Sequence, residues 1–466
     1  MENKIPVFEK SAVDEFYPVD RIKRLNNQFE QSFKSSPTHY CRSPGRLNII
    51  GEHIDYSGFS VLPMAIDRDC LMAFSFQKSD KPTIKIANTN PKYKSSEFGT
   101  DFTIDLKAHD WTTYFKCGFK GVLETYNVHS VSVQVVVDGT VPTGSGLSSS
   151  SAFVCCSALL TSYIHNLSPT KGELTQIAIK SERYCGVESG GMDQSISIVA
   201  NKTPLLIDFE PKLNATLVDF KLNDLVFVIA NTLVVSDKAV TAPIHYNLRV
   251  VECRLIVALL GFYLKKEYKN LWDFVEKEKD SSDNVDKFEK PLALVKQHLS
   301  GDYTRQDIAK ILDIDVSKVE EEYIKPIQIR ATEFKLLKRA VHILTEAQRV
   351  YKFVKACQVG DPVVLGNLMV NSFFIQNESQ ASCRDYFECS CYEIDKVCEL
   401  AAKNGSLGSR LTGAGWGGCT VHLIRKDNLS SFMDGMKEYY SEIGYEGDLG
   451  QVLFSSVPSI GAIVFQ

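Results

Sequence analysis

The pattern of apolar and polar positions separates a strand-rich first half of the chain from a helix-rich second half. Residues 38–76 alternate apolar and polar positions between glycines, which predicts strands joined by turns. The β-branched run 131–137 predicts a further strand, and apolar residues at helical spacing predict helices over 151–164 and 171–183. This mixture of element types indicates an α+β fold.

The second half opens with the apolar segment 224–232, which predicts a strand. It continues with predicted helices over 247–268, 334–357 and 391–403 and predicted strands over 418–424 and 461–466. The charged run 277–290 predicts a mobile, solvated surface connection. We therefore expect two domains, residues 1–218 and residues 219–466.

Composition narrows the class of protein. The chain has 466 residues, of which 44% are hydrophobic and 23% charged, as in soluble globular proteins. A net charge of −5 implies no basic face, so neither nucleic acid nor a membrane surface is expected as a partner. The longest apolar run, 255–264, is too short to span a bilayer. The start lacks the apolar core of a signal peptide, and we expect a cytoplasmic protein.

The cysteines agree with a reducing compartment. Thirteen are present, and Cys155 and Cys156 are adjacent within an apolar run, which indicates buried thiols. The cluster "CRDYFECSC" at 383–391 lacks the paired spacing of a zinc site, so no metal is expected there.

Candidate chemistry begins with "TGSGLSSSSA", residues 143–152, which lies between a predicted strand and a predicted helix. In that context backbone N–H groups and the helix dipole bind phosphate. The lysine of the common P-loop is absent, and flexible linkers have a similar composition. Composition alone leaves phosphate binding and a linker both open.

Three further segments carry unusual side chains. "SPGRLNIIGEHIDYSGFSVLPMAI" at 43–66 sets four ionisable residues among glycines, as a cup for a polyhydroxylated ligand or as an exposed turn with an ion pair. "ESGGMDQSIS" at 188–197 contains Asp193, which is a base, a helix cap or a surface group. The glycines of "GSRLTGAGWGGCTV" at 408–421 favour close backbone approach to another element or to a ligand.

Together, and in their order along the chain (43–66, 143–152, 188–197 and 408–421), the four segments resemble the galactokinase branch of the GHMP kinases, within which "GEHIDY" is specific to galactokinases. "SERYCGVESGGMDQSIS" is most similar to N-acetylgalactosamine kinases, whereas "KAVTAPIHYNLRVVECR" also resembles plant and fungal galactokinases. The resemblance implies the two-domain GHMP kinase fold, with the active site in the cleft between the domains. It implies transfer of the γ-phosphate of ATP to the anomeric hydroxyl of N-acetylgalactosamine, with galactose as a second substrate.

The resemblance also implies roles for individual residues. The ATP phosphates would be wrapped by Gly144, Ser145, Gly146, Leu147, Ser148, Ser149, Ser150 and Ser151. Ser150 and Glu182 would hold Mg²⁺, and Trp111 and Tyr114 would line the adenine pocket. The sugar would contact Arg46, Glu52, His53, Asp55, Gly190 and Tyr246. Asp193 would face the anomeric hydroxyl, with Arg46 beside it and favouring its ionised form. Sugar and ATP are the expected partners of a monomer.

Two alternatives and one departure remain. A galactose- and ATP-responsive regulatory protein without turnover could share the scaffold, but the complete "SSSSA" and the presence of Asp193 favour an enzyme. A mevalonate or homoserine kinase is disfavoured by "GEHIDY". In "NESQASC", Gln380 stands where relatives usually have histidine, and the preceding "GNLMVNSFFIQ" looks longer than the family pattern. We expect this change to affect local packing or sugar preference.

Overall fold

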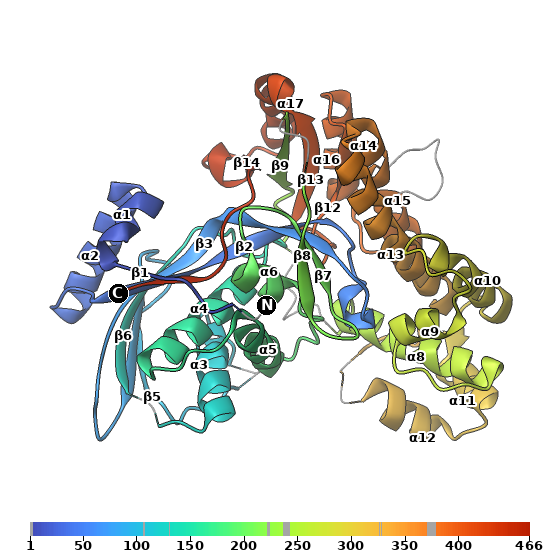
Figure 1. The fold of residues 1–466 in the computed structure, drawn as a ribbon, viewed down its shortest axis with the longest axis horizontal. Helices are drawn as coiled ribbons and strands as arrows, with labels where there is room; N and C mark the ends of the chain where they lie inside the picture. Colours follow the sequence, from blue (N-terminus) through green and yellow to red (C-terminus); the bar gives the residue numbers. More distant parts are fainter. Residues whose placement is uncertain are drawn as a thin grey trace.

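The fold is that of a computed structural model, which describes residues 3–105, 108–129, 131–220, 224–235, 243–325, 327, 329–370 and 379–466. Two sheets run through it, each packed against helices, and a helical region extends from the second (Figure 1). Hydrophobic contacts continue from one half into the other, because the largest buried cluster joins Ile49 and Leu62 of the first sheet to Leu411 and Val421 of the second.

The first sheet has seven strands in the order β1-β15-β2-β3-β6-β4-β5. Their bounds are β1 Val7–Phe8, β15 Ile463–Phe465, β2 His39–Ile50, β3 Leu62–Gln77, β6 Ser132–Gly139, β4 Thr83–Asn88 and β5 Ser96–Gly99. The pairs β1/β15 and β4/β6 are parallel and the others antiparallel.

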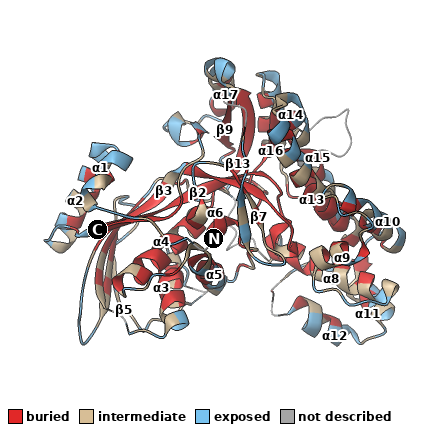
Figure 2. Cartoon of the chain, in the orientation of Figure 1, coloured by how far each residue is buried: buried red, intermediate tan, exposed pale blue. Residues whose placement is uncertain are grey.

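Helices cover both faces of this sheet. They are α1 Val13–Phe16, α2 Val19–Phe33, α3 Thr113–Tyr126, α4 Ser149–Ile164, α5 Lys171–Glu182 and α6 Met192–Val199. Along β3, Met72 and Phe74 pack with α3–α5, whereas Leu71 and Ala73 pack with α2. Alternate side chains of a strand point to opposite faces, so β3 is apolar almost throughout. Figure 2 shows β2 and β3 buried along most of their length, with the exposed residues on the outer sides of the helices.

The second sheet is antiparallel, with the order β12-β13-β9-β14. Its strands are β12 Gly408–Leu411, β13 Cys419–Arg425, β9 Leu225–Asn231 and β14 Leu453–Ser456, packed against α16 Tyr392–Lys403 and α17 Leu429–Glu442. The other helices are α8 Tyr246–Leu264, α9 Leu271–Glu278, α10 Glu289–His298, α11 Arg305–Leu312, α12 Val316–Val319, α13 Leu336–Val359, α14 Pro362–Met369 and α15 Ser379–Ser382. Two small hairpins pair β7 Leu205–Asp208 with β8 Asn214–Leu217 and β10 Tyr303–Thr304 with β11 Glu333–Phe334.

Most predicted elements lie within a few residues of their expected bounds. The largest difference is in the charged run 277–290, which holds the end of α9, a helical turn and the start of α10. Phe288 in that turn is fully buried, and Lys287 is also buried, where its ammonium group pairs with Glu276 at 3.1 Å. The run is therefore only partly a surface connection. Residues 371–376 of "GNLMVNSFFIQ" lie outside the described residues.

The last strand shows why a division at one point of the chain is only approximate. The second sheet starts with β9 at Leu225, close to the predicted boundary, but β15 near the C-terminus returns to the first sheet beside β2. The division into 1–218 and 219–466 stays a prediction.

All thirteen cysteines lie among the described residues and are free thiols, and twelve of them are buried, which confirms the interpretation of Cys155 and Cys156. In the described part of the chain, no helix combines the length and apolar character needed to span a membrane.

Candidate active site

The segment 143–152 connects β6 to α4 through a tight loop. Gly144 and Gly146 have positive φ, 65° and 75°, which glycine adopts without strain, and Ser148 also lies in the left-handed region at 61°. α4 starts at Ser149, and Ser148 makes no side-chain cap. The first backbone N–H groups of a helix have no intrahelical acceptor, so those of α4 are available to an anion.

A second glycine-rich loop, residues 412–418 between β12 and β13, supports the first. A Cβ atom on Gly413 would lie 2.4 Å from the carbonyl oxygen of Gly146, and one on Gly418 would lie 2.7 Å from that of Ser145. Only glycine fits at these contacts. The density of glycine in 408–421 is therefore explained by backbone packed on backbone.

Arg46 and Asp193 form a buried ion pair at the centre of the site. Arg46 comes from β2 and Asp193 from the first turn of α6, and Arg46 Nε donates to Asp193 Oδ1 at 2.8 Å across 147 residues of sequence. Arg46 also donates to the carbonyl oxygen of Gly146, and its backbone N–H donates to that of Leu147. The same guanidinium thus contacts the carboxylate and the loop before α4.

Glu182, at the end of α5, reaches the start of α4. Its Oε2 accepts from Ser151 Oγ at 2.7 Å and from Gln194 Nε2, while Ser151 Oγ is also 3.5 Å from Asp193 Oδ2. The hydroxyl that contacts Glu182 is therefore that of Ser151, which is buried, whereas Ser150 is half-buried. The spacing of residues in the sequence could not show which of the neighbouring serines contacts Glu182.

Glu52 lies deeper than expected for a residue that touches a ligand. It is fully buried, pairs with Arg410 of β12 and accepts from the N–H of Gly413 at 3.3 Å. Arg410 also lies 3.3 Å from Glu346 of α13, whose Oε1 accepts from the N–H of Gly51 at 2.9 Å. Burial raises the pKa of Glu52 to about 7, although Arg410 opposes that rise.

His53 and Asp55 follow β2, and the His53 ring packs near the ring of Tyr246. His53 Nε2 is 2.8 Å from the carbonyl oxygen of Ala414, and its ring centroid is 5.5 Å from that of Tyr246. Asp55 Oδ2 accepts from the N–H of Met192 at 3.4 Å, beside Gly190, where a Cβ atom would lie 2.4 Å from the Asp55 carboxyl carbon. Burial and then the charges of Asp55 and Asp193 raise the pKa of Tyr246 well above its usual value.

The aromatic pair Trp111 and Tyr114 lies at the start of α3, and both side chains are half-buried. Trp111 stacks on Phe153 of α4 with centroids 6.0 Å apart and planes inclined by 15°. It also contacts Tyr93, at 5.6 Å. The apolar group therefore adjoins the helix that starts at the phosphate-binding candidate.

Sequence reasoning missed several residues of the site. Phe387 and Trp416 pack on His53 at centroid distances of 4.8 and 5.4 Å, and Gln194 contacts Glu182. Arg410 and Glu346 enclose Glu52 from distant segments. Arg410 and Trp416 lie in the glycine-rich segment 408–421, Gln194 in 188–197 and Phe387 in 383–391, whereas Glu346 lies in none of the segments with unusual composition.

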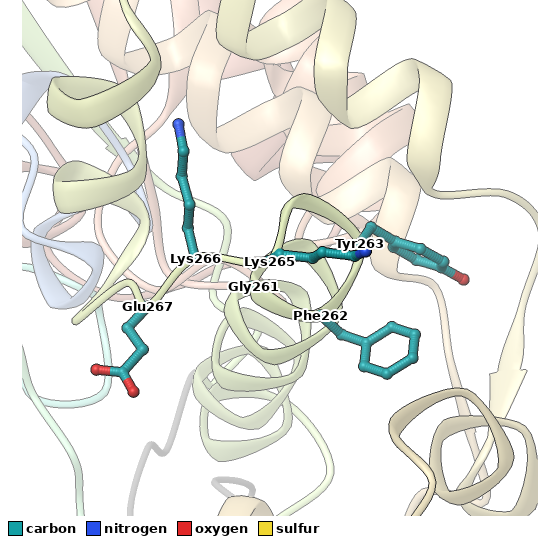
Figure 3. Close-up of a pocket in the computed structure, with 6 residues that line it drawn as sticks. All are labelled: Gly261, Phe262, Tyr263, Lys265, Lys266 and Glu267. Carbon is teal, nitrogen blue, oxygen red and sulfur yellow. The ribbon is translucent and has the colours of Figure 1, made fainter.

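A separate open hollow lies at the end of α8. Its lining residues are Gly261, Phe262, Tyr263, Lys265, Lys266 and Glu267 (Figure 3). The side chains of Phe262, Lys266 and Glu267 point away from one another, and Lys266 pairs with Glu278 at 2.6 Å. The hollow offers no convergent polar groups and shares no residue with the site around Asp193.

Comparison with known families defines the class. Residues 113–201 match the N-terminal domain of GHMP kinases and residues 353–442 match their C-terminal domain. A mevalonate kinase structure is alike in fold, with a TM-score of 0.52 at 16% identity. The chain is a GHMP kinase with two α+β domains, which confirms the predicted fold class.

The branch follows from closer matches. Residues 27–76 match the galactokinase galactose-binding signature. A galactokinase of Dictyostelium discoideum is 43% identical over 445 residues, covering 90% of this chain and 88% of that protein. A galactokinase of Saccharomyces cerevisiae is 35% identical over 518 residues, covering 99% of this chain and 98% of that protein. The structure of Lactococcus lactis galactokinase complexed with galactose matches with a TM-score of 0.71 at 25% identity. The match covers 95% of this chain and 99% of that protein.

This chain therefore belongs to the galactokinase family, and the predicted resemblance is confirmed. It is a phosphotransferase with an alcohol group as acceptor.

Proposed function

We propose that this chain transfers the γ-phosphate of ATP to the anomeric hydroxyl of galactose. The observation that carries the proposal is the buried Arg46–Asp193 pair, which lies between the sugar motif and the loop before α4. Phosphoryl transfer depends mainly on positioning and on charge neutralisation, and this pair provides both beside a phosphate-binding helix start. The finding that the relatives are galactokinases reverses the order of sugars expected from sequence: galactose comes first, and N-acetylgalactosamine stays a prediction.

The sugar would lie in a cup formed by His53, Asp55, Gly190 and Tyr246, with Glu52 at its base. Gly190 packs against Asp55, whose carboxylate accepts from the N–H of Met192, the residue before Asp193, so the cup adjoins the catalytic pair. Imidazole, phenol and carboxylate groups supply both hydrogen-bond donors and acceptors, as a polyhydroxylated ring requires.

The nucleotide would extend from the loop before α4 to the aromatic group on α3. Backbone N–H groups of residues 144–151 would bind the phosphates, and Trp111 and Tyr114 would contact adenine. The stacking of Trp111 on Phe153 keeps the aromatic wall next to α4.

In the reaction, Asp193 accepts a hydrogen bond from the anomeric hydroxyl and orients it or takes its proton. Arg46 balances the charge of Asp193 and of the transferring phosphoryl group. The low exposure of both side chains, 1% for Arg46 and 8% for Asp193, strengthens these electrostatic interactions by excluding water.

Glu182 and Ser150 would hold magnesium. The donor set fits this ion, because the buried Glu182 carboxylate and the Ser151 hydroxyl meet at the start of α4, next to Ser150, and Mg²⁺ takes oxygen ligands with substrate phosphates completing its shell. Magnesium, when bound, neutralises charge on the β- and γ-phosphates.

We expect Ser150→Ala to weaken the apparent affinity for magnesium about 10- to 100-fold and to leave the fold intact, since only a small half-buried hydroxyl is lost. Turnover measured against magnesium concentration tests this. Ser149→Ala, which removes the neighbouring hydroxyl, is the matched control. An unchanged magnesium dependence in Ser150→Ala would transfer the role to Ser151, the hydroxyl beside Glu182.

A panel of acceptors tests the proposed function. With labelled ATP we expect galactose to be phosphorylated and N-acetylgalactosamine to be used as a second substrate. Glucose should be used at least about 100-fold less efficiently, because a site built around particular hydroxyls rejects their inversion. Comparable turnover of glucose would contradict the cup. Binding of galactose and ATP without turnover would instead support the regulatory alternative.

The remaining expectations belong to the same proposal: a monomer in the cytoplasm, with sugar and ATP as its partners and neither nucleic acid nor membrane among them.

A further inference from the structure

Gln380 is a fully buried amide that joins three elements. It lies on α15, and its Oε1 accepts from the backbone N–H of Leu411 at 2.8 Å, at the end of β12. Its Nε2 donates to Ser390 Oγ at 3.0 Å and to Asp395 Oδ1 of α16 at 3.1 Å. We propose that Gln380 is a positioning residue for the glycine-rich loop 412–418, and that it holds this loop with a group that does not titrate. The inference rests on the proposed kinase function.

The hydrogen bond from Leu411 to Gln380 replaces a bond that a neighbouring strand would otherwise accept. β12 is an edge of the second sheet, so the N–H groups on its outer side have no strand partner. Leu411 is the last residue of β12, opposite Thr420, and Thr412 follows with its N–H directed to Cys419 of β13. The Gln380 amide therefore fixes the outer side of β12 where the chain leaves the sheet.

The loop that starts there contacts the active site directly through its first two residues, Thr412 and Gly413. Thr412 Oγ1 donates to the carbonyl oxygen of Asn48 at 3.0 Å and accepts from its N–H at 2.9 Å. Gly413 donates to Glu52 and leaves no room for a Cβ atom beside Gly146. A shift at Leu411 is transmitted to the sugar motif and to the phosphate loop, and small misplacements of a site are costly to its rate.

The chemistry of the position requires one acceptor and one donor. Leu411 offers an N–H that needs an acceptor, and the Asp395 carboxylate, which already accepts from Ser390 Oγ at 2.9 Å, takes a second hydrogen bond from the amide. Glutamine supplies both at every pH, and a neutral imidazole supplies the same pair, whereas an imidazolium ion has only donors. A histidine at 380 would therefore hold the loop only while neutral.

The surrounding charges determine where such a histidine would titrate. Charged and titratable groups on the elements packed against α15, or paired with Gln380, include Cys383, Arg384, Asp385, Tyr386, Arg339, Arg349, Arg410, His342, Glu346 and Asp395, and the charge of Glu399 acts on Asp395. Arg384 pairs with Asp385, and Arg410 with Glu52 and Glu346. Burial lowers the pKa of His342 to about 4, which leaves it neutral. Asp395 is thus the charged group in direct contact, and its carboxylate would favour the imidazolium form.

We expect Gln380→His to match the wild type in kcat/KM at pH 8 and to fall about ten-fold below it at pH 6, because a buried N–H without an acceptor is costly. The loss should reverse on return to pH 8, and circular dichroism at pH 6 should show a folded protein. A role in stability alone would not produce a reversible loss of activity in folded enzyme.

Two further variants sharpen the test. Adding Asp395→Asn to Gln380→His removes the carboxylate that favours the imidazolium form, so the loss should move to lower pH. Gln380→Leu removes acceptor and donor together and should lower kcat at every pH with the wild-type profile.

The inference is overturned if the kcat/KM of Gln380→His follows that of the wild type from pH 6 to 8. It is also overturned if this kcat/KM is below that of the wild type by the same factor at every pH. Full activity of Gln380→Leu overturns it as well. Failure of the wild type to phosphorylate any sugar overturns the proposed function instead.

Discussion

Replacing Asp193 by asparagine is expected to lower kcat and kcat/KM together by about 10²–10⁴-fold, the usual worth of general acid–base assistance. Asparagine keeps one oxygen acceptor for Arg46 Nε, which lies 2.8 Å from the carboxylate, and its amide can still contact Ser151. The negative charge beside the anomeric hydroxyl is lost, and Arg46 loses its counter-ion. Sugar should therefore still bind, and the loss should fall on the chemical step.

The measurement combines steady-state kinetics, calorimetric binding of galactose and thermal melting on one preparation. A capping role for Asp193, in the first turn of α6, predicts instead a stability loss of about 1 kcal/mol with near-normal turnover. Glu173→Gln is a matched control, because Glu173 is a first-turn carboxylate in the capping box of α5, away from the site. It should lose stability only. A destabilised but fully active Asp193→Asn enzyme would remove Asp193 from the mechanism.

Many regular elements could be predicted from local sequence patterns. The helices α4, α5, α13 and α16 and the strands β2, β3 and β9 follow patterns that depend only on neighbouring residues. The helix α2 was missed although Ile22, Leu25 and Phe29 share its buried face at helical spacing. The polar residues on its other face make this helix strongly amphipathic, so the signal was present in the sequence.

Long-range placement was not available from local patterns. The segment 461–466 reads as a strand, but nothing within it shows that β15 pairs with β2 at the other end of the chain. Likewise Glu52 reads as a ligand-facing residue, and its burial follows from Arg410 and Glu346, which lie far along the sequence. Contact between Arg46 and Asp193 could be expected only from the family resemblance, which implied the fold; no local pattern connects the two residues.

Arg410→Met is expected to destabilise the protein by about 3–5 kcal/mol, the cost of removing one partner from a buried ion pair. Arg410 is fully buried between Glu52 and Glu346 and also donates to the carbonyl oxygen of Ile49 at 3.1 Å. Methionine fills similar volume but leaves two carboxylates and that carbonyl uncompensated in the interior. Glu346 keeps Arg349, at 2.9 Å, so Glu52 loses more.

The loss should also depend on pH. Burial raises the pKa of Glu52 to about 7 even with Arg410 beside it, and removing Arg410 raises that pKa further. For Glu346, burial raises the pKa, but Arg410 and Arg349 outweigh burial and hold it well below its usual value, so this pKa rises too. A carboxyl whose folded pKa exceeds its unfolded value, about 4.3, contributes stability below that unfolded value and loses it as pH rises. Arg410→Met should therefore be less destabilised at pH 5 than at pH 8.

Urea unfolding of wild type and variant at both pH values measures the effect. Arg425→Met is the matched control on the adjacent strand β13, because Arg425 pairs with Asp224 at 2.9 Å with both side chains at least 40% exposed. An exposed pair contributes below about 1 kcal/mol. If Arg410→Met cost no more than Arg425→Met, or cost the same at pH 5 and pH 8, the two buried carboxylates would not depend on Arg410. The connection that it makes between the sugar motif on β2 and the glycine-rich loop after β12 would then rest on backbone packing alone.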